Sequence, residues 1–230
     1  MSRAQRRPAA RKSPAERAAE VADAARDLAL EHGLTAVTLR GVAARVGVTP
    51  ALVAHYEPSM DALVAATFTS IVAAEIDELE RLVTRVRTPT ARLAALIDTL
   101  LDGTRDDVTV VWVEAWALGR RNEVLAASVR EQMDAWQAVV EGIVEAGIAS
   151  GEFQATDAVA VAWQVLGMID GLNAQELVRW GDAGARGSLI GAAIEGMLGL
   201  ERGSLGITGA DGAAGAVGAA GASGAGASGR

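Results

Sequence analysis

The sequence predicts an all-α protein of about nine helices, and three observations support this class. Apolar residues recur at helical spacing through almost the whole chain. A Ser or Thr followed by Pro, a helix N-cap followed by the residue favoured at the first helical position, occurs at 13–14, 49–50 and 88–89. The β-branched run VTVVWV at 108–113 reads as a strand by propensity alone. Because no partner strand follows or precedes it, we expect this run to be helical as well.

The first helix has three agreeing start signals. Ser13 can cap it, Pro14 suits its first position, and the Glu16 side chain can bond back to the cap. Apolar residues then recur on one face until Gly33, which stops the helix.

Two short helices follow in close succession. Thr38 can cap the first, over residues 39–46, and Gly47 stands where a helix end often needs a positive φ. Thr49 and Pro50 open the next helix only two residues later. Two short helices joined by a tight glycine turn form a helix-turn-helix, whose second helix is built to lie in the DNA major groove.

The segment EHGLTAVTLRGVAARVGVTPALVAHYEPSMDAL at 31–63 carries a more specific signal. It resembles the DNA-binding domain of the TetR family of transcriptional regulators, without gaps. The resemblance implies an N-terminal three-helix DNA-binding domain at 13–60 and a larger helical ligand-binding and dimerisation domain at 61–202. It also implies a sequence-specific regulator that binds double-stranded DNA as a homodimer.

By this resemblance, the helix from Thr49 to Tyr56 is the recognition helix. Hydroxyl and imidazole groups suit contacts to phosphates or base edges, and small apolar side chains suit thymine methyl groups. We expect DNA contacts from Thr38, Arg40, Thr49, Pro50, Ala51, Val53, His55 and Tyr56.

The chain departs from the family pattern at three positions. Ala54 and Glu57 stand where family members commonly have aromatic residues, and Met60 stands where they commonly have Lys. Loss of that lysine removes a charge directed at phosphate, although the free N–H groups of a helix starting near Ser59 can still bind one. Glu57 would oppose DNA unless it pairs locally, with His55 or Arg45 as the candidates.

Charge is divided unevenly along the chain. The net charge is −8, yet residues 1–56 hold nine Lys and Arg against five Asp and Glu, which leaves +4 there and −12 in the remainder. This asymmetry favours a basic surface that meets a polyanion and an acidic body that does not. We expect residues 1–12 to be a basic, disordered arm that either enters an adjacent minor groove or is merely a solvated tail.

The larger half is helical by its pattern and ends in a different composition. Residues 203–230 are rich in Gly, Ala and Ser and cannot bury a core, so we expect a disordered tail. The helices that we expect before it span about 62–82, 89–101, 108–113 and its flanks, 123–149, 157–180 and 185–200.

Three segments of this half, WVEAWALGRRNEVL, EAGIASGEF and MIDGLNAQ, resemble the C-terminal domain of the BetI-type repressor subgroup. All five tryptophans also lie here. They either pack in a core or, as a set, line a pocket for a small apolar or aromatic effector. We expect pocket residues at Trp112, Trp116, Met133, Trp136, Trp163, Gln164, Met168 and Asn173, with Glu114 as a further polar candidate.

Glycine and alanine are frequent in GMIDG at 167–171 and in GSLIGAAIEG at 187–196. Small residues let two helices approach closely, and the resemblance implies that these helices form a four-helix bundle in a homodimer. Packing within one chain is the alternative explanation. A dimer would let two recognition helices read a palindromic operator.

Other function classes lack sequence support. The chain has no cysteine, no apolar run of membrane-spanning length and no signal core at its start, which favours a cytoplasmic location without membrane contact. No phosphate-cradling glycine motif or catalytic constellation is present, so we expect no enzyme, cofactor or metal. We expect a repressor released from DNA by its effector. The alternative is a non-catalytic protein-interaction adaptor of the same fold with weakened DNA binding.

Overall fold

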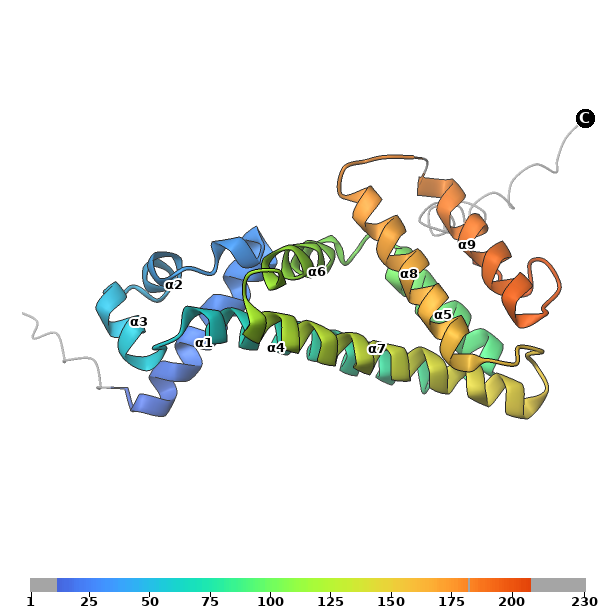
Figure 1. Ribbon diagram of the computed structural model, residues 1–230, viewed down its shortest axis with the longest axis horizontal. Helices are drawn as coiled ribbons and strands as arrows, with labels where there is room; N and C mark the ends of the chain where they lie inside the picture. The colour runs from blue at the N-terminus through green and yellow to red at the C-terminus, as the bar shows by residue number, and fades with distance from the viewer. Residues whose placement is uncertain (1–11, 182, 208–230) are drawn as a thin grey trace, which may run out of the picture.

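The computed structural model describes residues 12–181 and 183–207, which form nine α-helices, one short 3₁₀ helix and no strand (Figure 1). The all-α class is therefore confirmed, and VTVVWV lies within a helix. The elements are α1 (Pro14–His32), η1 (Leu34–Ala36), α2 (Leu39–Val46), α3 (Pro50–Tyr56), α4 (Met60–Val83), α5 (Pro89–Leu101), α6 (Asp106–Gly119), α7 (Glu123–Ser150), α8 (Ala158–Glu176) and α9 (Ala183–Leu198).

The first three helices form a small head whose ends are set by local hydrogen bonds. The Glu16 carboxylate accepts from the Ser13 N–H at 2.6 Å, and the Ser13 hydroxyl accepts from the Glu16 N–H at 3.2 Å. This reciprocal pair closes the predicted capping box at the start of α1. Gly47 ends α2 at φ 74°, in the left-handed region that favours glycine. The chain therefore turns sharply before Thr49 caps α3.

One apolar core joins the head to the start of α4. Val21 and Ala25 of α1, Val42 of α2 and Val53 of α3 are all fully buried, and Leu63 of α4 is nearly so. At the surface, an Arg26 Nη1–H donates to the Ser70 carbonyl at 2.9 Å and ties α1 to α4. The head is therefore fixed on the first turns of α4.

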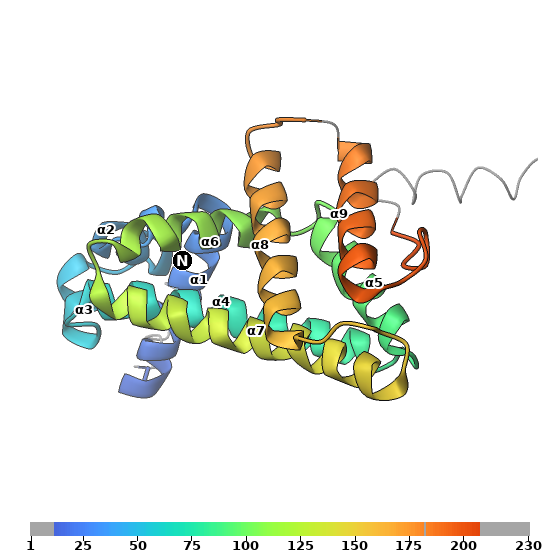
Figure 2. The same cartoon turned by 45° about the vertical axis from the view of Figure 1, so that its right-hand side comes forward.

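The rest of the molecule, from α4 to α9, is called the body. Two long helices, α4 and α7, lie side by side and form its axis (Figures 1 and 2). At about 1.5 Å of rise per residue, the 24 residues of α4 span about 36 Å, from the head to the far part of the body. Phe68, Leu79, Val140 and Val144 are fully buried along these two helices. A single helix thus carries residues of both the head and the body.

The end of α7 folds back on itself around a glycine. Gly151 stops the helix at φ 78°. Two residues later, the Phe153 N–H donates to the Gly147 carbonyl at 3.0 Å, and the buried Phe153 ring lies over Gly147. A Cβ at position 147 would stand 2.0 Å from Cδ2 of that ring. Only glycine leaves room for this contact.

The last two helices differ slightly from their predicted bounds. The expected helix to about residue 180 ends at Glu176, because the chain turns there and Arg179 adopts φ 55°. Buried Glu195 of α9 accepts hydrogen bonds from the N–H groups of Gly203 and Leu205, at 2.9 and 3.0 Å. Residues 203–207, the start of the expected tail, thus pack on α9. Residues 1–11 of the predicted arm and 208–230 of the tail lie outside the described residues.

Across the described ranges, no single helix combines the length and apolar content of a membrane span. Within the same ranges, only α3 and α4 taken together reach that length and apolar content, and this pair is bent by 74°.

Candidate functional site

The exposed face of α3 is the first candidate site. Thr49, Pro50, Ala51 and His55 are exposed on it, and Tyr56 is half-buried. The His55 and Tyr56 rings meet edge to face, with 5.1 Å between centroids and 80° between planes. The two rings that the sequence places side by side therefore support each other at the end of α3, and His55 faces outward.

Val53 occupies the opposite side of α3. Its side chain is 0% exposed and belongs to the core of the head, so the expectation that it faces a DNA groove is wrong. A seven-residue helix needs an anchoring apolar side chain, and Val53 supplies it. Ala54 is the exposed neighbour that shares the outer face with Ala51.

The start of α2 adds two exposed residues. Thr38 caps α2 by accepting from the Gly41 N–H at 3.0 Å, and Arg40 is exposed at the second position of the helix. Arg45 at the other end faces α1, where its Nη1–H donates to the Glu31 carboxylate at 2.8 Å. Among the described residues, Glu57 forms no ion pair, so neither of its candidate partners, His55 and Arg45, neutralises it.

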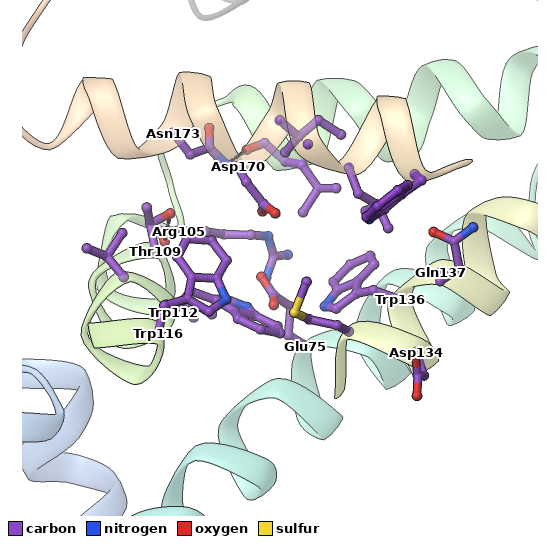
Figure 3. A pocket seen from close by; sticks show the side chains of 18 of the residues that line it. Glu75, Arg105, Thr109, Trp112, Trp116, Asp134, Trp136, Gln137, Asp170 and Asn173 are labelled. Atoms are coloured by element: carbon purple, nitrogen blue, oxygen red, sulfur yellow. Dashed lines mark hydrogen bonds between the residues drawn. The ribbon is translucent and has the colours of Figure 1, made fainter. Parts of the chain in front are cut away.

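The second candidate site is a cavity of about 640 Å³ in the body (Figure 3). Helices α4, α5, α6, α7 and α8 contribute to its wall. The structure brings six of the eight expected pocket residues together here: Trp112, Trp116, Met133, Trp136, Trp163 and Asn173.

Aromatic rings form much of the wall. The Trp112 and Trp116 centroids lie 5.7 Å apart, and Trp112 also meets the buried Phe68 ring edge to face at 4.9 Å. Trp136 is 6% exposed, whereas Trp163 is 73% exposed. The pocket therefore has a rigid aromatic interior and one tryptophan that is accessible to solvent.

Two expected pocket residues do not line the cavity. Gln164 is exposed on α8, and Met168 packs against the core without facing the cavity. The polar wall instead comes from residues that the sequence analysis missed, above all Glu75 and Asp170. Glu75 follows Ile71 and Val72 at spacings of four and three, so an acid on the apolar stripe of α4 was the available signal.

Both carboxyl groups have raised pKa values. Burial raises the pKa of Glu75 to about 7, with the Arg105 charge and a hydrogen bond from Trp112 acting in the opposite direction. Burial raises the pKa of Asp170 to about 6. Both acids therefore ionise near neutral pH, at a cost in free energy that a bound positive charge would reduce.

Two further polar groups in the wall have unfilled hydrogen-bonding capacity. Arg105 donates to Glu78 through Nη2–H at 3.1 Å, which leaves its Nε–H buried without a partner among the described residues. Gln137 donates through Nε2–H to the Val159 carbonyl at 2.9 Å, and its Oε1 is likewise buried and unpartnered there. Both atoms are covered by other protein atoms and have almost no accessible surface.

Glu114 has a role that the sequence did not predict. It does not line the cavity. Its carboxylate leaves α6 toward the head and accepts from Thr35, from the N–H at 2.9 Å and from the hydroxyl at 3.2 Å. Buried Gly33 lies directly beneath it, since a Cβ there would stand 2.6 Å from Glu114 Oε2. The helix that carries Trp112 and Trp116 is therefore bonded to η1, in the connection between α1 and α2.

Replacing Glu114 with Ala should loosen the connection between α1 and α2 selectively. The Thr35 amide would lose an ionic acceptor, so its hydrogen exchange should become about tenfold faster, while amides in the middle of α4 should keep their wild-type rates. Mass-spectrometric hydrogen exchange of the 33–37 segment would measure this. Glu131→Ala, an exposed change on α7, is the matched control. Equal hydrogen-exchange rates of this segment in wild type and Glu114→Ala would show that the Glu114–Thr35 hydrogen bonds do not restrain it.

A helix-turn-helix head joined to a helical body with a cavity between its helices defines a transcriptional regulator with a ligand-binding C-terminal domain. Two family models agree with this class. Residues 21–67 match the bacterial regulatory proteins of the tetR family, and residues 89–199 match the C-terminal domain of BetI-type transcriptional repressors. The chain belongs to the TetR family, whose fold is that of regulators rather than enzymes. No curated protein matches the chain.

Solved structures share the fold at low identity. A transcriptional regulator from Saccharomonospora viridis in complex with choline is 21% identical, with a TM-score of 0.65 over 72% of this chain and 88% of that one. A TetR-family regulator from Rhodococcus sp. is 18% identical, with a TM-score of 0.66 over 80% and 99%. The FadR regulator of Bacillus subtilis in complex with stearoyl-CoA is 20% identical, with a TM-score of 0.60 over 78% and 97%.

Proposed function

We propose that the protein is a homodimeric, cytoplasmic repressor that binds a palindromic DNA operator and leaves it when a small molecule with apolar or aromatic parts enters the cavity. The observation that carries this proposal is that two helices, α4 and α6, take part in both candidate sites. Helix α4 starts against the head and lines the cavity through Glu75, and α6 lines the cavity through its tryptophans and bonds the head through Glu114.

For the DNA contacts, the exposed residues at the start of α2 and along α3 supply the reading surface. Val53 is excluded because it is buried. The proposed contacts are Thr38, Arg40, Thr49, Pro50, Ala51, His55 and Tyr56. Ser59 caps α4 by accepting from the Ala62 N–H at 3.2 Å, and the remaining free N–H groups of that helix start can bind a phosphate where Met60 cannot.

The dimer interface is proposed on α8, α9 and the loop between them. Val178, Trp180 and Leu189 are between 65% and 75% exposed there, which is unusual for large apolar side chains in one region. Nothing lies within 4 Å of a Cβ built at Gly167 or Gly171 on α8, so another helix could approach closely. To read a palindrome, a dimer formed through this face must hold its two α3 helices about 34 Å apart, one turn of the DNA.

For the effector, the aromatic wall of the cavity supports a ligand with a substantial apolar part. Structural neighbours bound to choline and to stearoyl-CoA show that this fold holds ligands of very different size. Ligand entry would displace α6 and α4 together and change the distance between the heads of the two protomers. Because coupling is reciprocal, DNA must weaken effector binding by the same factor.

The first test is fluorescence anisotropy of the purified protein on DNA from upstream of its own gene, beside a scrambled duplex of equal length. We expect two chains to bind the native duplex tightly. The logarithm of the binding constant should fall linearly with the logarithm of the salt concentration. Equal and weak binding to both duplexes would direct the search to random-sequence selection. If selection also failed, the protein-interaction adaptor would be the better reading.

Arg40→Ala should reduce operator affinity and lower the slope of the salt dependence by about one, as loss of one phosphate contact does. Arg130→Ala, which removes an exposed arginine from α7, should leave both quantities unchanged. If the two variants had the same affinity and slope as wild type, the surface formed by α2 and α3 would not be the one that meets DNA.

A further inference from the structure

We propose that the effector of this pocket is an organic cation with a bulky apolar body, larger than choline, and that Glu75 and Asp170 bind its positive charge. This inference rests on the proposed function of the cavity as the effector site. It adds the charge, the size and the residues that select the ligand.

The balance of charge in the wall favours a cation. Among the described residues, four acids line the cavity against the single cation Arg105: Glu75 and Asp170, and the exposed Asp134 and Asp157. The terminal nitrogens of Arg105 already pair with Glu78, and Asp157 caps α8 by accepting from the Ala160 N–H at 2.9 Å. The carboxyl groups of buried Glu75 and half-buried Asp170 therefore lack a full counter-charge of their own, and a ligand is the group that can supply it.

Aromatic faces surround the same place. Figure 3 shows Glu75 and Asp170 on opposite sides of the cavity, with Trp112 and Trp116 to one side and Trp136 to the other. A desolvated cation over the face of Trp gains about 2 kcal/mol or more from the ring quadrupole, and Trp is the strongest aromatic partner for it. Carboxylates and indole faces thus favour the same ligand charge.

The size of the cavity separates this site from one built for a small quaternary amine. A volume of about 640 Å³ equals that of about 20 water molecules at about 30 Å³ each. A ligand that fills it has a body far larger than choline.

The test uses two probes of nearly the same shape and opposite charge, tetraphenylphosphonium and tetraphenylborate, with choline as the small cation. Four of the five tryptophans line the cavity, so intrinsic fluorescence reports its occupancy. We expect tetraphenylphosphonium to bind the full-length protein at least about tenfold more tightly than either tetraphenylborate or choline. Tetraphenylborate binding as tightly as the phosphonium, or failure of both cations to bind, would overturn the assignment.

Two isosteric variants locate the charge. Glu75→Gln and Asp170→Asn should each weaken tetraphenylphosphonium binding by about tenfold or more, because each removes a carboxylate from a partly desolvated site. Glu80→Gln, an exposed change on the same helix as Glu75, should leave the affinity unchanged. Circular dichroism establishes that each variant is folded. Wild-type affinity in both folded cavity variants would overturn the role given to these carboxyl groups.

Operator DNA separates this inference from the proposed function. If tetraphenylphosphonium binds through Glu75 but does not weaken operator binding, the cation site stands and the release mechanism falls. If operator binding is tight and specific but neither cation binds, the regulator stands and the cation site falls.

Discussion

Gly147→Ala is expected to lower the free energy of unfolding by about 3 kcal/mol, which is at the upper end for an overpacked site. The added methyl group would stand 2.0 Å from Cδ2 and 2.2 Å from Cε2 of Phe153, closer than any real contact. The ring cannot swing away easily, since it is 3% exposed and its own N–H is bonded to the Gly147 carbonyl. Urea unfolding followed by circular dichroism measures the loss.

Gly142→Ala is the matched control on the same helix. Nothing lies within 4 Å of a Cβ at position 142, so alanine there should raise stability by up to about 1 kcal/mol through its better helix propensity. The two substitutions are chemically identical and differ only in what covers the glycine. Similar midpoints for both variants would show that Phe153 does not sit on Gly147 in solution.

Glu75→Gln should have the second large effect, and its size should depend on pH. The folded state raises the pKa of Glu75 from 4.5 to about 7, so it binds that proton more tightly than the unfolded chain does. The stability from the protonated form is complete below about pH 4.5 and is lost as pH rises through about 7. Since one pKa unit corresponds to about 1.36 kcal/mol, the loss is about 3 kcal/mol.

Glutamine resembles the protonated acid and does not titrate. Wild type and Glu75→Gln should therefore have similar unfolding free energies near pH 4.5, and the variant should be more stable by about 3 kcal/mol at pH 8. The charged groups that act on Glu75 are Arg105, Asp107 and Glu78, which remain in both proteins. Urea unfolding at the two pH values gives the comparison, and a difference independent of pH would contradict the raised pKa.

This expected gain at high pH has a functional meaning. A buried acid that costs stability is retained more readily when a ligand needs it, because active and binding sites are where folding and function conflict. A cation bound between the carboxyl groups would remove the cost and stabilise the folded protein by mass action. The same two acids would thus destabilise the protein without its ligand and would bind the ligand when it is present.

Local signals were sufficient to predict the fold. Ser13, Thr38, Thr49, Thr88 and Asp157 are all N-caps in the structure, each accepting from a backbone N–H of its own first turn. The glycine stops at 33 and 47 are also found where expected. Such signals depend on a few consecutive residues, which is why they can be read without knowing what packs against the helix.

The site was harder to predict, because it depends on which side of a helix faces which neighbour. Val53 was assigned to the DNA surface, but in a helix of seven residues the same apolar residue is needed for the core. Glu114 was assigned to the pocket, yet it leaves α6 on the side of the head. Glu75 was overlooked, since an acid on an apolar stripe gains a meaning only when the tryptophans opposite it are known.

The length of α4 has a mechanical consequence. Glu75 and the first residue of the helix, Met60, are 15 residues apart, or about 22 Å along an unbroken rod. If the rod pivots near the cavity, a tilt of about 5° displaces its head end by about 2 Å, since arc length is the radius times the angle. A movement too small to disturb the packing around the ligand would then be magnified at the other end, and in a dimer two such levers would act on one stretch of DNA.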